Sequence, residues 1–111
     1  MSEKELEKLF VQEVRKAGGN AYKFVSPGQT GVPDRLVVFP GNHIGFVELK
    51  APGKKPRPDQ QYQQRKLVDY DCFVVNLDNP KEIGAVIHKI KNWRRDEMEV
   101  LLDALEESEV L

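Results

Sequence analysis

Two carboxylates and a lysine stand at the borders of two consecutive apolar runs. Asp34 precedes the run over residues 35–39, Glu48 lies near the end of the run over 44–49, and Lys50 follows it. Residues two apart on a strand project from the same face, so Glu48 and Lys50 share a side. Neighbouring carboxylates repel each other unless they share a cation, and Mg²⁺ takes one or two carboxylates beside water and substrate phosphate. These residues could therefore support metal-assisted phosphodiester hydrolysis, with the lysine orienting or deprotonating the attacking water.

The length of the turn between the two runs decides whether Asp34 meets Glu48. The segment Pro40-Gly41-Asn42-His43 between β-branched runs is typical of a β-hairpin. An odd loop, of three residues (40–42) or five (39–43), pairs residue 34 with 48, 36 with 46 and 38 with 44. Directly opposed β-carbons then lie about 5 Å apart. The alternative is that Glu48 and Lys50 form an ordinary surface ion pair without a metal.

A third carboxylate belongs to the first predicted helix, over residues 2–17. Leu6, Phe10 and Val14 repeat at helical spacing and define its buried stripe, and Gly18-Gly19 ends it. Glu7 falls on or beside that stripe, where a lone carboxylate is costly without a partner. Two roles remain open: Glu7 contributes to the acidic site, or it pairs with a nearby Lys or Arg.

The remaining pattern predicts one α/β domain. We expect a strand over 21–25, a loop over 26–33, an exposed connector over 51–58, a helix over 59–70 and a buried strand over 72–77. Asn79-Pro80-Lys81-Glu82 predicts a helix start. Gln60 lies in the helix over 59–70, where it could orient a water or a phosphate, or simply be exposed. The order is α-β-β-β-α-β-α around a small mixed sheet, followed by an amphipathic stretch from Trp93.

Composition excludes several classes of protein. The 111 residues are enough for one domain, and 40% hydrophobic content is that of a globular chain. The lone Cys72 cannot form an internal disulfide, and two scattered histidines do not supply a zinc site. The chain shows no signal peptide and no apolar run of about 20 residues, so we expect a cytoplasmic protein without a membrane segment.

The net charge of −1 hides an asymmetry. Residues 96–111 hold seven acidic side chains and no Lys or Arg, so residues 1–95 carry all 17 basic side chains and only 11 of the 18 acidic ones. We therefore divide the chain into a basic domain over 1–95 and an acidic amphipathic helical tail over 96–111. A basic surplus suits a polyanionic partner. For the tail, a solvated helix is favoured over a partner-binding segment or a DNA mimic.

Taken together, these residues resemble the PD-(D/E)xK nucleases. The resemblance is carried by Gly31-Val-Pro-Asp-Arg35, by Glu48-Leu-Lys50, by Gln60 in a helix, and by the first helix with its inward Glu7. Within that superfamily the chain is most similar to the VRR-NUC family, the virus-type replication-repair nucleases, in their small stand-alone form. The match spans residues 3 to about 90. It implies a restriction-endonuclease-like α/β core with a mixed sheet, and the C-terminal helical tail lies outside it.

The resemblance also implies a role for each site residue. Asp34, Glu48 and the main-chain carbonyl of Leu49 would bind Mg²⁺ or Mn²⁺, and Glu7 would reach a metal through water. Lys50 would be the catalytic lysine and Gln60 the supporting glutamine, although Gln64 occupies a position that is Tyr in some relatives. The DNA phosphate backbone would be held, without sequence readout, by Lys23, Ser26, Arg35, Lys54, Lys55 and Arg57.

The expected activity is that of a metal-dependent, structure-selective endodeoxyribonuclease. Stand-alone members of the family resemble Holliday-junction resolvases, which cut two strands, so we expect a twofold homodimer acting on branched or junction DNA in a bacterial or phage-infected cell. Two alternatives stay open. One is an endonuclease for flaps, nicks or linear duplexes, and the other is a non-catalytic DNA-binding subunit with the same fold.

Overall fold

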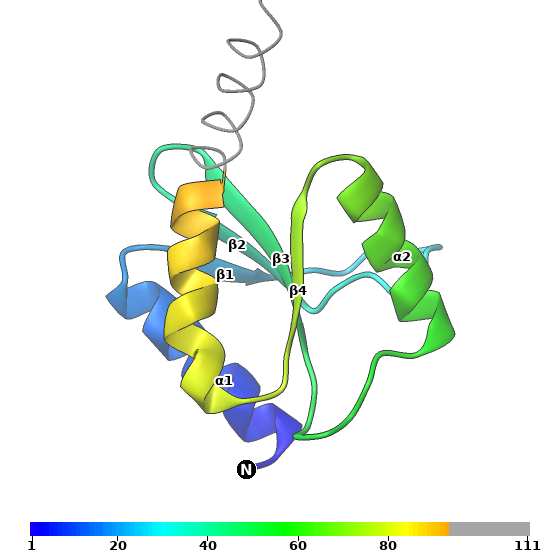
Figure 1. Cartoon of the computed structure of the whole chain (residues 1–111), viewed down its shortest axis with the longest axis horizontal. Helices are drawn as coiled ribbons and strands as arrows, with labels where there is room; N and C mark the ends of the chain where they lie inside the picture. Colours follow the sequence, from blue (N-terminus) through cyan, green and yellow to red (C-terminus); the bar gives the residue numbers. More distant parts are fainter. Residues whose placement is uncertain (94–111) are drawn as a thin grey trace, which may run out of the picture.

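The computed structural model describes residues 1–93 and contains one four-stranded mixed sheet (Figure 1). The elements along the chain are α1 (Glu3–Lys16), β1 (Asn20–Lys23), β2 (Arg35–Phe39), β3 (His43–Leu49), α2 (Pro58–Asp69), β4 (Phe73–Leu77), the 3₁₀ turn η1 (Pro80–Glu82) and a helix over residues 83–93. This order confirms the predicted α-β-β-β-α-β-α fold. The expected acidic helical tail over 96–111 lies outside the described residues.

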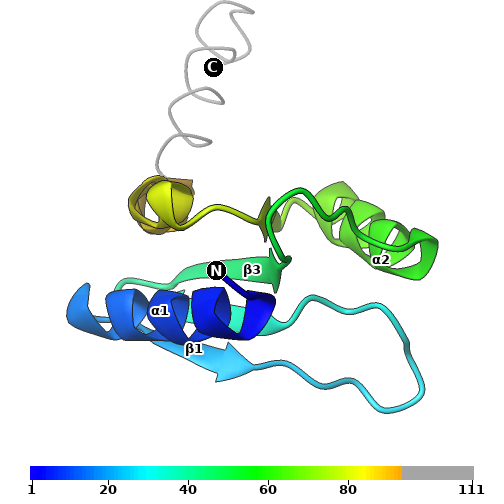
Figure 2. The same cartoon turned by 90° about the horizontal axis from the view of Figure 1, so that it is seen from below.

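The strands are arranged β1-β2-β3-β4, with β1, β2 and β3 antiparallel and β4 parallel to β3. The parallel pair requires a crossover, and α2 supplies it. The helix over 83–93 and α2 lie on opposite sides of β4, as both views of the molecule show (Figures 1 and 2). The sheet is therefore covered by helices on both faces.

One face of the sheet carries the hydrophobic core. Alternate strand residues such as Val37, Val47 and Leu77 are fully buried there. They belong to one cluster with the buried stripe of α1, which is Leu6, Phe10 and Val14 as predicted, and with Ile83, Val86 and Ile90 from the last described helix. Because Val37 and Val47 point into this core, the alternate side chains of β2 and β3, including Glu48, point to the opposite face, toward α2.

Caps and turns account for the boundaries of α1 and the hairpin. Ser2 caps α1, because its Oγ accepts a hydrogen bond from the Glu5 amide at 3.1 Å. The hairpin turn spans residues 40–42, and the left-handed conformations of Gly41 (φ 90°) and Asn42 (φ 65°) close it. The observed pairs Leu36 with Phe46 and Val38 with Ile44 confirm the predicted register.

The structure departs from several predicted boundaries by one or two residues. The strand predicted over 21–25 is β1 over Asn20–Lys23 and ends two residues earlier. Pro58 belongs to the first turn of α2 rather than to the connector, as its fixed φ angle allows. The helix predicted to begin at residue 79 begins with η1, in which the Asn79 side chain accepts a hydrogen bond from the Lys81 amide at 3.0 Å, and becomes α-helical from residue 83. Among residues 1–93 there is no helix with the length and apolar character required to cross a bilayer.

Candidate active site

Asp34 and Glu48 are tied to each other's strands where the β2–β3 ladder ends. The register places residue 34 opposite residue 48, as the turn length predicted. The Asp34 amide donates to Glu48 Oε1 at 3.1 Å, and the Leu49 amide donates to Asp34 Oδ2 at 2.9 Å. Each carboxylate therefore accepts a main-chain hydrogen bond from the opposite strand. These two bonds hold the acidic side chains next to each other.

Glu48 is the most deeply buried charged residue of this group, with 1% of its surface exposed. Its Oε2 accepts a hydrogen bond from Gln60 Nε2 at 2.6 Å and lies 3.3 Å from Lys50 Nζ. Burial, reinforced by the adjacent Asp34, raises the pKa of Glu48 to about 7, and the Lys50 ammonium opposes that rise only in part. The positive charge of Lys50 is therefore not enough to keep the pKa of Glu48 at its ordinary value.

Gln60 reaches the site from the first turn of α2. Its Oε1 accepts a hydrogen bond from the Arg57 amide at 2.9 Å while its Nε2 donates to Glu48, and the residue is 6% exposed. Of the two roles open from the sequence, simple exposure is wrong. One turn further along, the Gln64 and Asn76 amides exchange two hydrogen bonds, of 2.7 and 3.1 Å, and attach the middle of α2 to β4.

Gly31 allows the loop before β2 to touch the start of α2, a role that the sequence pattern did not predict. Its φ is +86°, and a β-carbon there would overlap the main chain of Asp59 and Gln60. The loop leads directly to Asp34, so this close approach brings Asp34 and Gln60 to the same place. A glycine three residues before the aspartate was the only signal available in the sequence.

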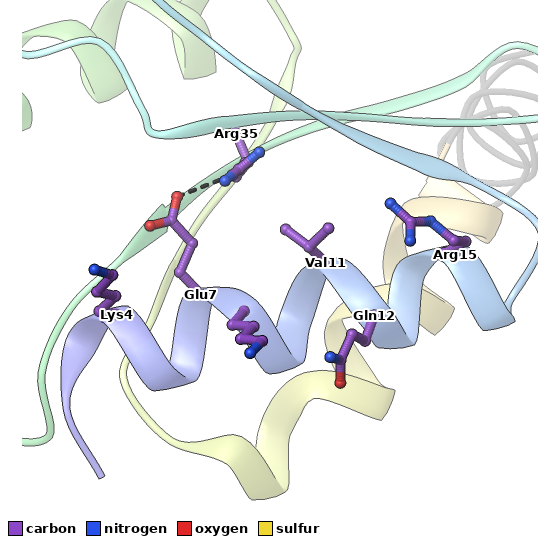
Figure 3. Close-up of a pocket in the computed structure, with 7 residues that line it drawn as sticks. Lys4, Glu7, Val11, Gln12, Arg15 and Arg35 are labelled. Atoms are coloured by element: carbon purple, nitrogen blue, oxygen red, sulfur yellow. Dashed lines mark hydrogen bonds and ion pairs between the residues drawn. The ribbon is translucent and has the colours of Figure 1, made fainter.

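Glu7 takes the second of its two predicted roles, as the partner of a basic residue. Its Oε2 accepts a hydrogen bond from Arg35 Nε at 2.9 Å (Figure 3). Arg35 Nη1 also donates to the Ala21 carbonyl at 3.1 Å. Over the described range, no group of three or more His, Cys, Asp or Glu side chains converges in the manner of a metal site. The structure brings Asp34, Glu48, Lys50 and Gln60 together, and Glu7 contacts the neighbouring Arg35.

The predicted DNA contacts are spread over three segments. Lys23 at the end of β1 and Lys54, Lys55 and Arg57 in the connector are exposed, while Ser26 and Arg35 are half-buried. Two of these residues already have partners: Arg57 Nε lies 3.3 Å from Asp59, and Arg35 is bound to Glu7. The lysines are the candidates that retain full access to a phosphate.

The donor set fits a hard divalent cation. Two adjacent carboxylates and a main-chain carbonyl are the oxygen ligands that Mg²⁺ and Mn²⁺ prefer. The raised pKa of Glu48 supports this fit, because a cation at the carboxylates would favour the ionised form that burial and Asp34 disfavour. Asp34, Glu48 and the Leu49 carbonyl would hold the ion.

The raised pKa of Glu48 predicts an unusual pH dependence of stability in the absence of metal. Between about pH 4.5 and 7 the folded chain retains a proton on Glu48 that the unfolded chain has released. The free energy of unfolding should therefore fall by up to about 3 kcal/mol as pH rises through this range. Urea titrations in EDTA from pH 4.5 to 8 measure it.

Two variants test whether Glu48 causes the expected fall in the free energy of unfolding. Glu48→Gln should flatten the decrease, whereas Glu82→Gln, which neutralises an exposed carboxylate, should leave it unchanged. Adding Mn²⁺ at pH 8 should restore stability to the wild type more than to Glu48→Gln. Equal slopes in wild type and Glu48→Gln would contradict the assignment.

Comparisons with known proteins agree with this geometry. No family model matches the chain. The chain is 54% identical over 85 residues to a protein named "Putative nuclease p44" from Acyrthosiphon pisum secondary endosymbiont phage 1, and the match covers 77% of this chain and 90% of that protein. A solved structure described as "VRR_NUC domain" superposes with a TM-score of 0.73 at 26% identity, covering 79% of this chain and 97% of the other.

Proposed function

The chain belongs to the VRR-NUC family of nucleases, and on that premise we propose that it is a divalent-metal-dependent, structure-selective endodeoxyribonuclease acting as a homodimer on branched DNA. The observation that carries the proposal is the meeting of Asp34, Glu48, Lys50 and Gln60 at the end of β3. Two acidic oxygen donors with an ammonium beside them suit the hydrolysis of a phosphodiester.

Each side chain has a distinct task in this proposal. Asp34, Glu48 and the Leu49 carbonyl bind Mg²⁺ or Mn²⁺, which when present neutralises charge on the scissile phosphate and lowers the pKa of a water ligand. Lys50 orients the attacking water or accepts its proton, and its Nζ lies 3.3 Å from Glu48. Gln60 fixes the orientation of the Glu48 carboxylate through its 2.6 Å hydrogen bond. We place Glu7 outside the metal ligands, as the residue that positions Arg35 beside Asp34.

We infer a twofold dimer from the expected substrate and not from an observed contact between two chains. One chain carries one group of these residues, and resolving a four-way junction requires two incisions. We therefore propose that two copies place two sites on one junction. A sedimentation measurement that gives the monomer mass across micromolar concentrations would contradict this part of the proposal. The phage origin of the relative is compatible with action in the cytoplasm of an infected bacterium.

Cleavage of a substrate panel tests the proposed function. Labelled four-way junction, flap, nicked and linear duplex DNA are incubated with the protein in Mn²⁺, in Mg²⁺ and in excess EDTA. We expect paired incisions in the junction, slower cutting of the linear duplex and no cutting in EDTA. Preference for flaps or nicks would favour the alternative endonuclease, and binding without cleavage in either metal would favour a non-catalytic subunit. Cleavage that persists in EDTA would exclude the metal mechanism.

A further inference from the structure

A groove runs beside α1, on the face of the sheet opposite Asp34 and Glu48. It has a volume of about 450 Å³ and is lined by residues of α1 and by the start of β2, namely Lys4, Glu7, Lys8, Val11, Gln12, Arg15 and Arg35. Figure 3 shows Lys4, Glu7, Val11 and Arg15 along one side of the helix, with Arg35 facing Glu7 across the groove. Their spacing of three or four residues places them on one helix face.

The groove has an excess of positive charge that is available to a ligand. Its one carboxylate, Glu7, is already bound to Arg35 at 2.9 Å. Lys4, Lys8 and Arg15 are exposed and make no ion pair with any residue between 1 and 93. Three cations therefore face the solvent along this surface while the internal pair is neutral. An anion could bind here without displacing an existing ion pair.

The position of the groove indicates which anion it would bind. Arg35, at the start of β2, closes one side of it, and the preceding residue, Asp34, lies at the same end of the sheet with its carboxylate beside Glu48 on the opposite face. From Lys4 to Arg15 the helix rises about 16 Å. One strand of duplex DNA carries a phosphate about every 3.4 Å along its axis, so this length spans about five phosphates. A backbone that crosses the metal ligands and passes around this end of the sheet would meet the groove.

We propose that the α1 groove is a second binding site for the DNA sugar-phosphate backbone, and this inference rests on the proposed nuclease function. Lys4, Lys8 and Arg15 bind phosphates of the DNA that extends past the sheet end, and Gln12 adds a neutral donor. Arg35 acts as a positioning residue, because Glu7 and the Ala21 carbonyl hold its guanidinium at the end of the groove nearest Asp34. The groove aligns DNA and carries no sequence information.

The test separates backbone binding from catalysis. The variant Lys4→Gln/Lys8→Gln/Arg15→Gln removes three charges from the groove. The matched control, Lys81→Gln/Arg65→Gln/Lys89→Gln, removes three exposed basic charges outside it that likewise make no ion pair among residues 1–93. Affinity for a fluorescein-labelled duplex and for a four-way junction is measured by anisotropy in EDTA from 50 to 200 mM salt, so that binding is read without cleavage. Circular dichroism and thermal melting verify that both variants are folded.

We expect the groove variant to lose on the order of ten- to a hundredfold in affinity at 150 mM salt, and its salt slope to fall by about two to three. The control should change both quantities much less. An equal loss in the two variants would overturn the proposal, since it would show only the effect of net charge. Absence of cleavage by the wild type would overturn the proposed function while leaving the binding comparison valid.

Discussion

Asp34→Asn is expected to lose about a thousandfold or more of the metal-dependent cleavage rate while remaining folded. The amide oxygen can still accept the hydrogen bond from the Leu49 amide, which is 2.9 Å from the carboxylate in the wild type. What the substitution removes is one of the two negative charges next to the proposed metal. A Lewis acid contributes several kcal/mol to the stabilisation of a phosphoryl transition state, which corresponds to a loss of this size. Single-turnover cleavage in Mn²⁺ and a thermal melt measure the two effects.

A matched pair of substitutions makes this result specific. Asp69→Asn makes the same chemical change at an exposed position at the end of α2 and should cut at the wild-type rate. Lys50→Gln should also lose cleavage but should keep the thermal shift that Mn²⁺ produces, because the lysine is proposed to act on water and not on the ion. Retention of wild-type cleavage by Asp34→Asn would exclude Asp34 as a ligand.

Gly31→Ala is expected to destabilise the protein by about 2–4 kcal/mol and to reduce cleavage as well. The left-handed conformation costs a β-carbon-bearing residue about 1–2 kcal/mol, and overlap with the main chain at the start of α2 adds a similar amount. Relief of the overlap would move Asp59 and Gln60 away from the loop and so loosen the hydrogen bond from Gln60 to Glu48. Urea denaturation and the cleavage rate of the folded fraction measure both effects.

The same loop offers the control for Gly31. Gly28 has a φ of +83°, close to that of Gly31, but a β-carbon there would meet no atom within 4 Å. Gly28→Ala should therefore show the conformational cost alone, about 1–2 kcal/mol, and should leave cleavage by the folded protein unchanged. Equal effects of the two substitutions would show that the contact with α2 does not matter.

The sequence predicted the hairpin and its carboxylates because both depend on local rules. Alternation within a strand and the parity of the turn are properties of short segments, so residues 34 and 48 could be paired without a structure. The α1 stripe was predictable for the same reason. The burial of Gln60 was not, because α2 has few apolar residues to orient it, and what buries Gln60 is Glu48 on a strand 12 residues earlier.

The partner of Glu7 was also beyond local reasoning. Helical periodicity placed the side chain beside the apolar face, but Arg35 lies 28 residues away along the chain. Arg35 becomes the partner of Glu7 only through the packing of α1 against the sheet. Gly31 is a similar case. A side chain is excluded at this position because the main chain of α2 lies against it, and α2 begins 27 residues later in the sequence. Contacts between segments that are distant in sequence decide the details of the site, and local sequence patterns do not specify which residues make those contacts.

The core described above joins the first helix to the last described one, since Leu6 and Phe10 belong to the same cluster as Val86 and Ile90. During synthesis on a ribosome, the residues near position 90 must therefore emerge before the early helix has its complete binding surface. Contacts so far apart in sequence form late, because a long loop must close first. A partly synthesised chain that already contains every proposed catalytic side chain should therefore still lack a stable arrangement of them until the residues near position 90 have emerged.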